Sequence, residues 1–251
     1  MKMTGRVLVG LVMALVGVLA AAGTAGAAPR GEAATCAGGT IAAGTYQSLM
    51  VTGTCTLPDG GTVIVNGNVT VGQGAILNAL TPATLDVSGN ISVRWGGSLA
   101  LGCSPAAGCE TTTNDFVGGN IHANHPLVMI LHSNTIAGNV SINGGGGGVN
   151  CDFNPNLSSP NFSTFEDNRI GGNAHVAGME SCWLGFIRNQ IGGTALLSNN
   201  VMADPDANEF VTNTIKGNLV CFRNSPAPQV GDSGGEPNVV AGRKIGQCTA
   251  V

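Results

Sequence analysis

The sequence predicts an all-β fold, a right-handed parallel β-helix, because one seven-residue pattern recurs along most of the chain. The pattern is apolar, variable, Gly, Asn, apolar, variable, apolar, and only the copy with Gly193-Thr194 lacks the asparagine. The seven copies begin at Val65, Val87, Val117, Ile136, Ile170, Ile191 and Ile215. Their spacings run from 19 to 34 residues, which fits a coil of about 20 residues that carries inserted loops. Coils this short must stack on one another to bury their apolar side chains.

The composition agrees with a stacked solenoid. Glycine contributes 40 of the 251 residues, hydrophobic residues make up 43% of the chain, and charged residues only 10%. A chain that is apolar in a periodic way can bury a core, whereas a disordered chain is poor in apolar residues and rich in charge. With strands about 4.8 Å apart, roughly nine or ten coils would form a single rod about 45 Å long.

The elements of each coil follow from the pattern. Its last three places alternate as a strand with one buried face does, and we expect Gly-Asn to form the corner, with both residues in the left-handed backbone region. One asparagine stands two places before the leading isoleucine in the later copies, namely Asn134, Asn168, Asn189 and Asn213. Others fill the fourth place of the pattern, namely Asn120, Asn139 and Asn173. We expect two ladders of stacked side-chain amides.

The chain divides into four parts. They are a secretory signal peptide, an N-terminal cap with the first coil, the coils with their inserted loops, and a C-terminal cap, at residues 1–27, 28–61, 62–222 and 223–251. The signal peptide is indicated by Lys2 and Arg6 before an apolar run that is short for a membrane span and by the cleavage-like Ala25-Gly26-Ala27. We therefore expect a secreted protein, extracellular or associated with the cell envelope, with no membrane span.

Charge argues against one class of partner. Without the signal peptide the chain keeps eight basic and fourteen acidic residues, a formal charge of −6. A nucleic-acid-binding domain is usually basic, so we expect no nucleic-acid partner. No residue pattern calls for a cofactor, and we expect a monomer.

Eight cysteines in an exported chain predict four disulfides. Stacking favours partners about one coil apart, which selects Cys36 with Cys55, Cys151 with Cys182, and Cys221 with Cys248, and leaves Cys103 with Cys109 to close a small loop. A zinc site would need Cys-x-x-Cys pairs, and the sequence has none.

Two long segments interrupt the repeat. They run from Leu101 to Phe116 and from Asn143 to Phe165, and the second contains five consecutive glycines, Gly144 to Gly148. Insertions in a β-helix tend to collect on one flank, and loops carry most binding residues. We expect both segments on one flank and the functional surface beside them.

The candidate catalytic residues are His132, Glu166, Asp167 and Arg188. Aligning the leading isoleucines places His132 next to Glu166, and Asp167 next to Arg188, on adjacent coils. One interpretation is a set of cross-strand ion pairs, each contributing a few tenths of a kcal/mol. The other is that the group supplies the acid, the base or cation ligands for reaction on a polysaccharide.

Two further histidines share one place of the repeat. His122 and His175 both follow Gly-Asn-apolar, and Ser141 has that place in the copy between them. Two coils would separate the histidine backbones by about 9.6 Å, which is long for a shared metal ion. We interpret both as exposed strand residues and predict no metal site.

One short motif suggests a different chemistry. Gly231-Asp232-Ser233-Gly234-Gly235 resembles the nucleophile segment of trypsin-like serine proteases. That family also has an Ala-Ala-His-Cys type of histidine segment and two antiparallel barrels, whereas this chain is committed to coils and none of its histidines has that context. We interpret the motif as a turn in the C-terminal cap.

The Gly-Asn corners, the asparagine ladders and the signal peptide together resemble secreted bacterial β-helix proteins of the pectin-lyase-like superfamily, over about residues 60–222. Members of that superfamily include pectate lyases, with clustered calcium-binding acids and a basic residue, and polygalacturonases, with paired aspartates. The coils here have no Asp-Asp pair and only scattered basic residues. The resemblance therefore implies the fold and no catalytic residue.

Two functions remain open at this point. The first is a non-catalytic rod that presents its loops to an extracellular glycan or a surface protein, or that has a structural surface role. The second is a polysaccharide lyase or glycoside hydrolase that uses His132, Glu166, Asp167 and Arg188. The scarcity of acids, bases and nucleophiles favours the first.

Overall fold

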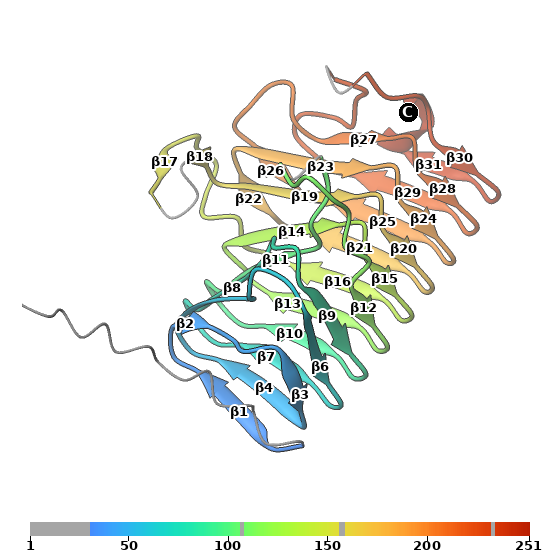
Figure 1. Cartoon of the computed structure of the whole chain (residues 1–251). Coiled ribbons are helices and arrows are strands. Elements are labelled where there is room, and N and C mark those ends of the chain that lie inside the picture. Colours follow the sequence, from blue (N-terminus) through green and yellow to red (C-terminus); the bar gives the residue numbers. More distant parts are fainter. Residues whose placement is uncertain (1–30, 106–107, 156–158, 232–233) are drawn as a thin grey trace, which may run out of the picture.

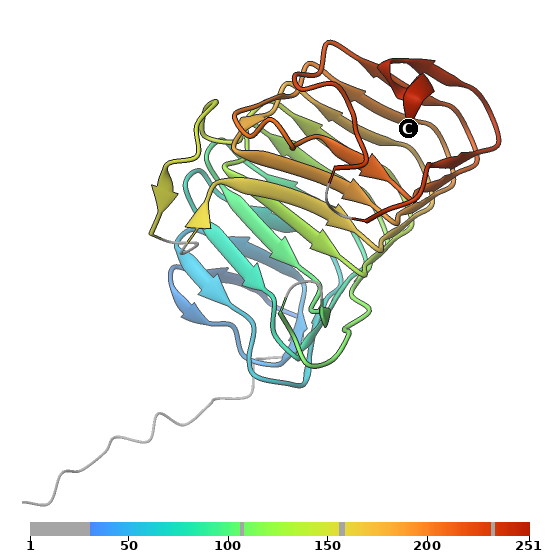
Figure 2. The same cartoon turned by 90° about the horizontal axis from the view of Figure 1, so that it is seen from above.

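Each coil of the chain consists of short strands, and equivalent strands of successive coils stack into three long parallel sheets, as the computed structural model shows (Figure 1). The structure describes residues 31–105, 108–155, 159–231 and 234–251. The predicted signal peptide lies outside the described residues, as do Asp232 and Ser233 of the protease-like motif. Seen from above, the coils follow one another in chain order along the stack (Figure 2). The fold is the predicted parallel β-helix.

Each sheet takes one strand from nearly every coil. Sheet A contains β1 (Ala33–Cys36), β4 (Ser48–Val51), β7 (Val69–Val71), β10 (Ile91–Val93), β13 (Ile121–Asn124), β16 (Val140–Asn143), β21 (Ala174–Ala177), β25 (Ala195–Ser198), β29 (Leu219–Phe222) and β31 (Lys244–Gly246). Sheet B contains β2 (Gly39–Thr40), β5 (Thr54–Thr56), β8 (Ile76–Ala79), β11 (Ser98–Leu101), β14 (Val128–His132), β19 (Phe162–Glu166), β23 (Trp183–Ile187) and β27 (Glu209–Val211). Sheet C contains β3 (Gly44–Tyr46), β6 (Thr62–Val65), β9 (Thr84–Val87), β12 (Phe116–Val117), β15 (Thr135–Ile136), β20 (Arg169–Ile170), β24 (Gln190–Ile191), β28 (Thr214–Ile215) and β30 (Val239–Val240).

The remaining elements lie beside the stack. Strands β17 (Phe153–Asn154) and β18 (Ser159–Pro160) pair antiparallel, and β22 (Glu180–Ser181) pairs in parallel with β26 (Val201–Met202). The 3-10 helix η2 (Gln247–Ala250) follows the last strand. Residues 33–61 already supply β1 to β5, and 223–251 supply β30 and β31, so coil strands continue into both predicted cap segments.

The core fills the inside of the coils. The leading apolar residue of every repeat copy ends a strand of sheet C, and all seven are at most 2% exposed. Strand alternation then points every second residue of sheet A inward, as the burial of Ile121 and Ala123 on either side of His122 shows. In sheet B three phenylalanines, Phe165, Phe186 and Phe210, stack with ring centroids 6.0 and 6.5 Å apart.

The glycine of each Gly-Asn corner is explained by space. The prediction of left-handed backbone at these corners is wrong, because neither the glycines nor the asparagines of the repeat have positive φ. A Cβ atom on Gly89 would lie 2.6 Å from the carbonyl oxygen of Gly67, one coil away, and 2.5 Å from Asn68 Oδ1. Glycine is therefore needed because adjacent coils approach closely.

The first predicted ladder is confirmed and lies inside the stack. Asn134, Asn168 and Asn189 each donate from Nδ2 to Oδ1 of the next asparagine at 2.9–3.0 Å, and Asn213 continues the ladder to Asn238 at 2.8 Å. Each Nδ2 group also donates to a backbone carbonyl of sheet B, as Asn168 does to Leu131 at 2.7 Å. Buried amides without partners would destabilise the fold, so the ladder both satisfies them and fixes the register of the coils.

The second predicted ladder is also confirmed, but it lies at the surface. Asn139 Nδ2 donates to Asn120 Oδ1 at 3.0 Å, and the Asn173 backbone N–H donates to Asn139 Oδ1 at 2.7 Å. The ladder begins earlier than predicted, since Asn68 and Asn90 form the same contact. All five side chains are exposed, so this ladder contributes less than the buried one.

All four predicted disulfides are formed. They join Cys36 to Cys55, Cys103 to Cys109, Cys151 to Cys182, and Cys221 to Cys248. The inserted segments, however, do not share one flank. Residues 102–115 connect sheet B to sheet C, whereas 144–161 connect sheet A to sheet B. Any corner can accept an insertion that leaves the strands in place, and the pattern does not say which corner an insertion interrupts.

Candidate functional site

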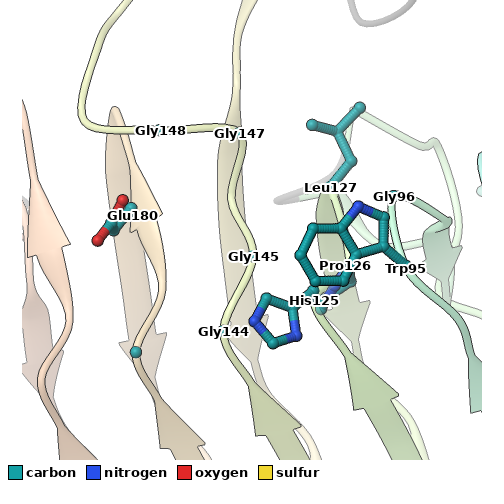
Figure 3. Close-up of a pocket in the computed structure, with 11 residues that line it drawn as sticks. Trp95, Gly96, His125, Pro126, Leu127, Gly144, Gly145, Gly147, Gly148 and Glu180 are labelled. Carbon is teal, nitrogen blue, oxygen red and sulfur yellow. The ribbon is translucent and has the colours of Figure 1, made fainter.

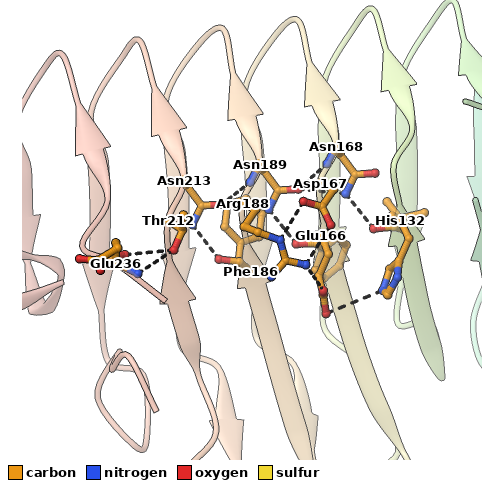
Figure 4. Close-up of polar contacts among 12 residues, drawn as sticks. His132, Glu166, Asp167, Asn168, Phe186, Arg188, Asn189, Thr212, Asn213 and Glu236 are labelled. Carbon is orange, nitrogen blue, oxygen red and sulfur yellow. Dashed lines mark hydrogen bonds and ion pairs between the residues drawn. The ribbon is translucent and has the colours of Figure 1, made fainter. Parts of the chain in front are cut away.

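The four predicted candidates do meet, at the corner where β14, β19 and β23 end (Figure 4). Strand pairing aligns His132 with Glu166. Arg188 donates from Nη2 to Glu166 Oε2 at 2.7 Å and to Asp167 Oδ2 at 2.9 Å, and from Nε to Asp167 Oδ1 at 2.8 Å. The predicted pairing of residues across coils is therefore confirmed, and we call these four residues the ion cluster.

Burial sets the charge of the ion cluster. Desolvation lowers the pKa of His132, which is 4% exposed, and the negative charge of Glu166 opposes that shift. His132 Nε2 is hydrogen-bonded to Thr164 Oγ1 and is 3.9 Å from Glu166 Oε1. The hydrogen bond to Asp167 is the main cause that raises the pKa of Arg188. His132 is thus neutral near pH 7, and the formal charges are those of one arginine and two carboxylates.

The ion cluster serves to tie adjacent coils together. The guanidinium holds Asp167 in a bidentate contact and also holds Glu166, so both carboxylates are paired with the same cation. Asp167 and Arg188 have φ values of 57° and 56°, which turn both side chains outward at the corner. Groups satisfied by one another have little left to offer a substrate, and a catalytic role for them stays a prediction.

The second predicted histidine arrangement has the expected geometry. His122 and His175 pair with Ser141 from either side in sheet A. His122 is exposed as predicted, whereas His175 is half-buried. Within the part of the chain that the structure describes, no group of three or more His, Cys, Asp or Glu side chains is placed to hold a metal ion.

A cleft of about 390 Å³ opens at a different corner, between sheets A and B (Figure 3). Four residues at equivalent places on successive coils form a column there, after β10, β13, β16 and β21. They are Trp95, His125, Gly144 and Gly178. The column changes from two large rings to two glycines, so side chains wall the cleft on one side and backbone forms its floor.

The wall is a stacked pair of rings. The Trp95 indole and the His125 imidazole lie with centroids 4.3 Å apart and an interplanar angle of 17°. A Cβ atom on Gly144 would lie 2.6 Å from His125 Nε2, so the imidazole rests directly on bare backbone. His125 Nδ1 is 2.8 Å from Asn124 Oδ1. If the amide oxygen accepts this hydrogen bond, Nδ1 carries the proton and Nε2 is free to accept another. The indole is 59% exposed, so its outer face is open to a ligand.

The floor is the run of five glycines. All five have φ between 67° and 101°, a region that other residues avoid. The N–H groups of Gly146 and Gly148 donate to the carbonyls of Pro126 and Glu180, at 2.8 and 2.9 Å. The N–H groups of Gly145 and Gly147 have no protein acceptor among the described residues. Both of these glycines line the cleft.

Glu180 completes the cleft on the side opposite the rings (Figure 3). Its backbone N–H donates to the carbonyl of Gly145 at 2.8 Å, which fixes the start of β22 against the glycine run. The side chain itself is exposed. An aromatic face, backbone N–H donors and one carboxylate acceptor therefore surround the same space.

The sequence did not locate this cleft, although it held part of the signal. The glycine run was predicted to lie near the functional surface. The structure places this run beside Trp95 and His125. Those two residues lie outside the seven-residue pattern, so aligning the repeat copies did not bring them together. Extending each copy by two residues would have placed them in one column, because the strands of sheet A continue in register.

Comparison with known proteins gives no family or function for this chain. No protein-family model, curated protein or solved structure matches this chain. Across residues 31–105, 108–155, 159–231 and 234–251, no helix has the length and apolar character that a membrane crossing requires. Together with the four disulfides, this finding is compatible with an extracellular protein.

Proposed function

We propose that this protein is a secreted β-helix that binds an extracellular polysaccharide, without cleaving it, in the cleft between Trp95 and Glu180. One observation carries the proposal, namely that the exposed indole of Trp95, stacked on His125, lines the same cleft as the bare backbone of the glycine run. An exposed tryptophan side chain forgoes the favourable free energy of burying its indole. The stacking contact with His125 holds the indole in one orientation.

The chemistry of a sugar ring fits this arrangement. A pyranose has a face of C–H groups and an edge of hydroxyl groups, so it can lie on an aromatic ring while its hydroxyls meet polar groups. The free N–H groups of Gly145 and Gly147 are donors, and the carboxylate of Glu180 is an acceptor. The floor lacks side chains, which leaves room for the ring.

Rigidity supports binding by this surface. The glycine run is hydrogen-bonded to the coils before and after it, at Pro126 and Glu180. The Cys151–Cys182 disulfide closes the excursion that follows the run. A site held in its binding conformation loses little entropy when it takes up a ligand.

The charge of the cleft favours a neutral polysaccharide. Glu180 is the one carboxylate among the described lining residues, and no arginine or lysine lines the cleft. The chain as a whole carries a net charge of −4. Acidic polymers would be repelled at low ionic strength, so we expect tighter binding of neutral glycans.

The experiment that tests this proposal compares Trp95→Ala with Phe222→Ala. Phe222 is an exposed aromatic residue, 42% exposed, on β29 away from the cleft. Isothermal titration against a panel of neutral and acidic polysaccharides should show binding by the wild type that falls at least about tenfold in Trp95→Ala. Phe222→Ala should bind as the wild type does. Equal affinity of both variants would contradict the cleft as the site.

The alternative function, a lyase or hydrolase that uses the ion cluster, needs its own measurement. Size-exclusion analysis of the same polysaccharides after incubation, with and without calcium, asks whether the chains become shorter. Glycosidases normally use two carboxylates across the scissile bond, so Glu166→Ala and Asp167→Ala should abolish any cleavage that this cluster causes. Intact chains with the wild-type protein would leave binding as the function.

A further inference from the structure

The buried asparagine ladder extends by one coil before Asn134, where an aspartate takes the place of an asparagine. Strand pairing aligns Phe116 with Thr135, which puts Asp115 at the ladder place of the coil before Asn134. Asp115 is fully buried. Its Oδ1 accepts from the backbone N–H of Leu85 at 3.0 Å, just as Asn168 Oδ1 accepts from the backbone N–H of Asn134. A carboxyl group therefore has the pose of a ladder amide.

The joint between Asp115 and Asn134 contains two buried oxygens that no donor reaches with hydrogen-bond geometry, although the Gly102 N–H lies near the Asp115 carboxyl group. In the rest of the ladder, Nδ2 of one asparagine donates to Oδ1 of the next. At this joint, Asp115 Oδ2 stands in the place of Nδ2, and neither Asp115 Oδ2 nor Asn134 Oδ1 has a hydrogen-bond partner among the described residues. The register places these two residues side by side on adjacent coils, and two lone-pair atoms that face each other there repel unless a proton, a water molecule or a cation lies between them.

We propose that Asp115 is the first member of the buried ladder in its protonated form, with its Oδ2–H donating to Asn134 Oδ1, so that ionisation of this one carboxyl breaks the ladder. A single proton satisfies both unpaired atoms and reproduces the donor pattern of the asparagines. The carboxylic acid then acts as an amide does, with one oxygen accepting and the other donating.

The surroundings of Asp115 favour the acid form. Burial raises its pKa to about 7, against an ordinary value of 3.8, while the backbone N–H groups of Leu85 and Gly102 oppose the shift. The charged group that acts on it is Asp86 of β9, which raises the pKa further. On the next coil it faces Asn134 and Thr135, which carry no charge. No cation is therefore near enough to stabilise the carboxylate.

The consequence concerns the 102–114 loop. Asp115 ends this loop, and its backbone carbonyl accepts from the Thr135 N–H at 2.9 Å. Because the folded pKa lies above the ordinary value, the stabilisation from this group is complete below about pH 4 and is lost as the pH rises to about 7. Above pH 7 a buried anion faces Asn134 Oδ1, and the anchoring of the disulfide-closed loop weakens.

The test compares the wild type with Asp115→Asn and with Asp86→Asn, a control that removes the neighbouring charge and keeps the ladder. Infrared difference spectra of the wild type should show the C=O stretch of a protonated carboxylic acid at pH 6, where ordinary carboxyl groups are almost fully ionised, and this band should disappear at pH 9. Asp86→Asn should keep this band, and Asp115→Asn should lack it. The unfolding midpoint of the wild type should fall relative to Asp115→Asn by about 5–10 °C between pH 4 and pH 8.

Three results would overturn the proposal. The first is a carboxylic acid band at pH 6 that is absent from the wild type, or that is equally strong in the wild type and in Asp115→Asn. The second is a pair of midpoint curves for wild type and Asp115→Asn that stay parallel across the pH range. The third is a rise in the wild-type midpoint at pH 9 on adding calcium chloride that Asp115→Asn lacks, because a bound cation would then hold the two oxygens. An Asn134→Ser variant tests the partner, since the band must shift in frequency if the proton is shared with Asn134.

Discussion

The ion cluster and the cleft both form where residues at equivalent places stack at a corner of the coil. In the ion cluster the stacked side chains are paired with one another, whereas in the cleft they remain open to solvent. Both lie at corners where outward side chains stack from coil to coil, and both corners contain residues with left-handed backbone, with φ of 57° at Asp167 and 48° at His125. In the ion cluster, Arg188 fills its column and neutralises its neighbours. In the cleft, the column changes from two rings to two glycines, which leaves the imidazole resting on bare backbone, one face of the Trp95 indole exposed, and two glycine N–H groups without acceptors among the described residues.

The difference teaches where binding arises on a coil stack. A complete column of side chains ties coils together, because every group finds a partner one coil away. An interrupted column exposes the groups at its edge, and the interruption costs little where the backbone is hydrogen-bonded to both adjacent coils. Under the proposed function, binding takes place where a column is interrupted, and stability comes from the columns that are complete.

The strongest way to break this comparison is to disrupt the floor of the cleft with Gly145→Ala. A Cβ atom there would overlap the carbonyl oxygen of Pro126, and the φ of 97° strains any other residue. We expect a loss of about 3 kcal/mol or more in the free energy of unfolding, measured by denaturant titration. Gly148→Ala is the matched control, since its new Cβ would meet only the flexible Asn150 side chain at 3.2 Å. A loss as large in the control would show that space is not the cause.

A subtler change converts the cleft into a filled column. Gly178→Asn restores a side chain at φ 69°, where asparagine is tolerated, and its Cβ would meet only the Gly144 backbone at 3.6 Å. We expect polysaccharide affinity to fall about tenfold while stability changes by less than about 1 kcal/mol. Gly234→Asn, at a similar φ of 67° with open space around it and outside the cleft lining, should leave affinity unchanged. If Gly178→Asn binds as the wild type does, the ligand does not enter this part of the cleft.

The smallest effect is expected from Arg188→Ala. The guanidinium is 40% exposed, so solvent screens its contacts with Glu166 and Asp167. The free energy of unfolding should fall by about 1 kcal/mol, seen as a shift in the urea midpoint, and polysaccharide affinity should not change. A loss of binding without a loss of stability would make the ion cluster part of the functional site after all.

The regular part of this structure was predictable because stacking makes equivalent residues meet. The asparagine ladders and the contact of Asp167 with Arg188 follow from aligning repeat copies. Three of the four disulfides follow from the spacing of their cysteines by about one coil. The role of the repeat glycines was not predictable. Glycine is favoured both where φ is positive and where two backbones approach closely, and a sequence pattern cannot separate these two causes. The cleft was missed because it depends on five glycine backbones and on Trp95, none of which belongs to the repeat.

The buried ladder also bears on how such a chain can change its length. Each asparagine offers the same donor to the following coil and the same acceptor to the preceding one. A whole coil can therefore be duplicated or deleted between two equivalent asparagines, and the new neighbours will recognise each other as the old ones did. The number of coils can therefore change during evolution without altering the cleft.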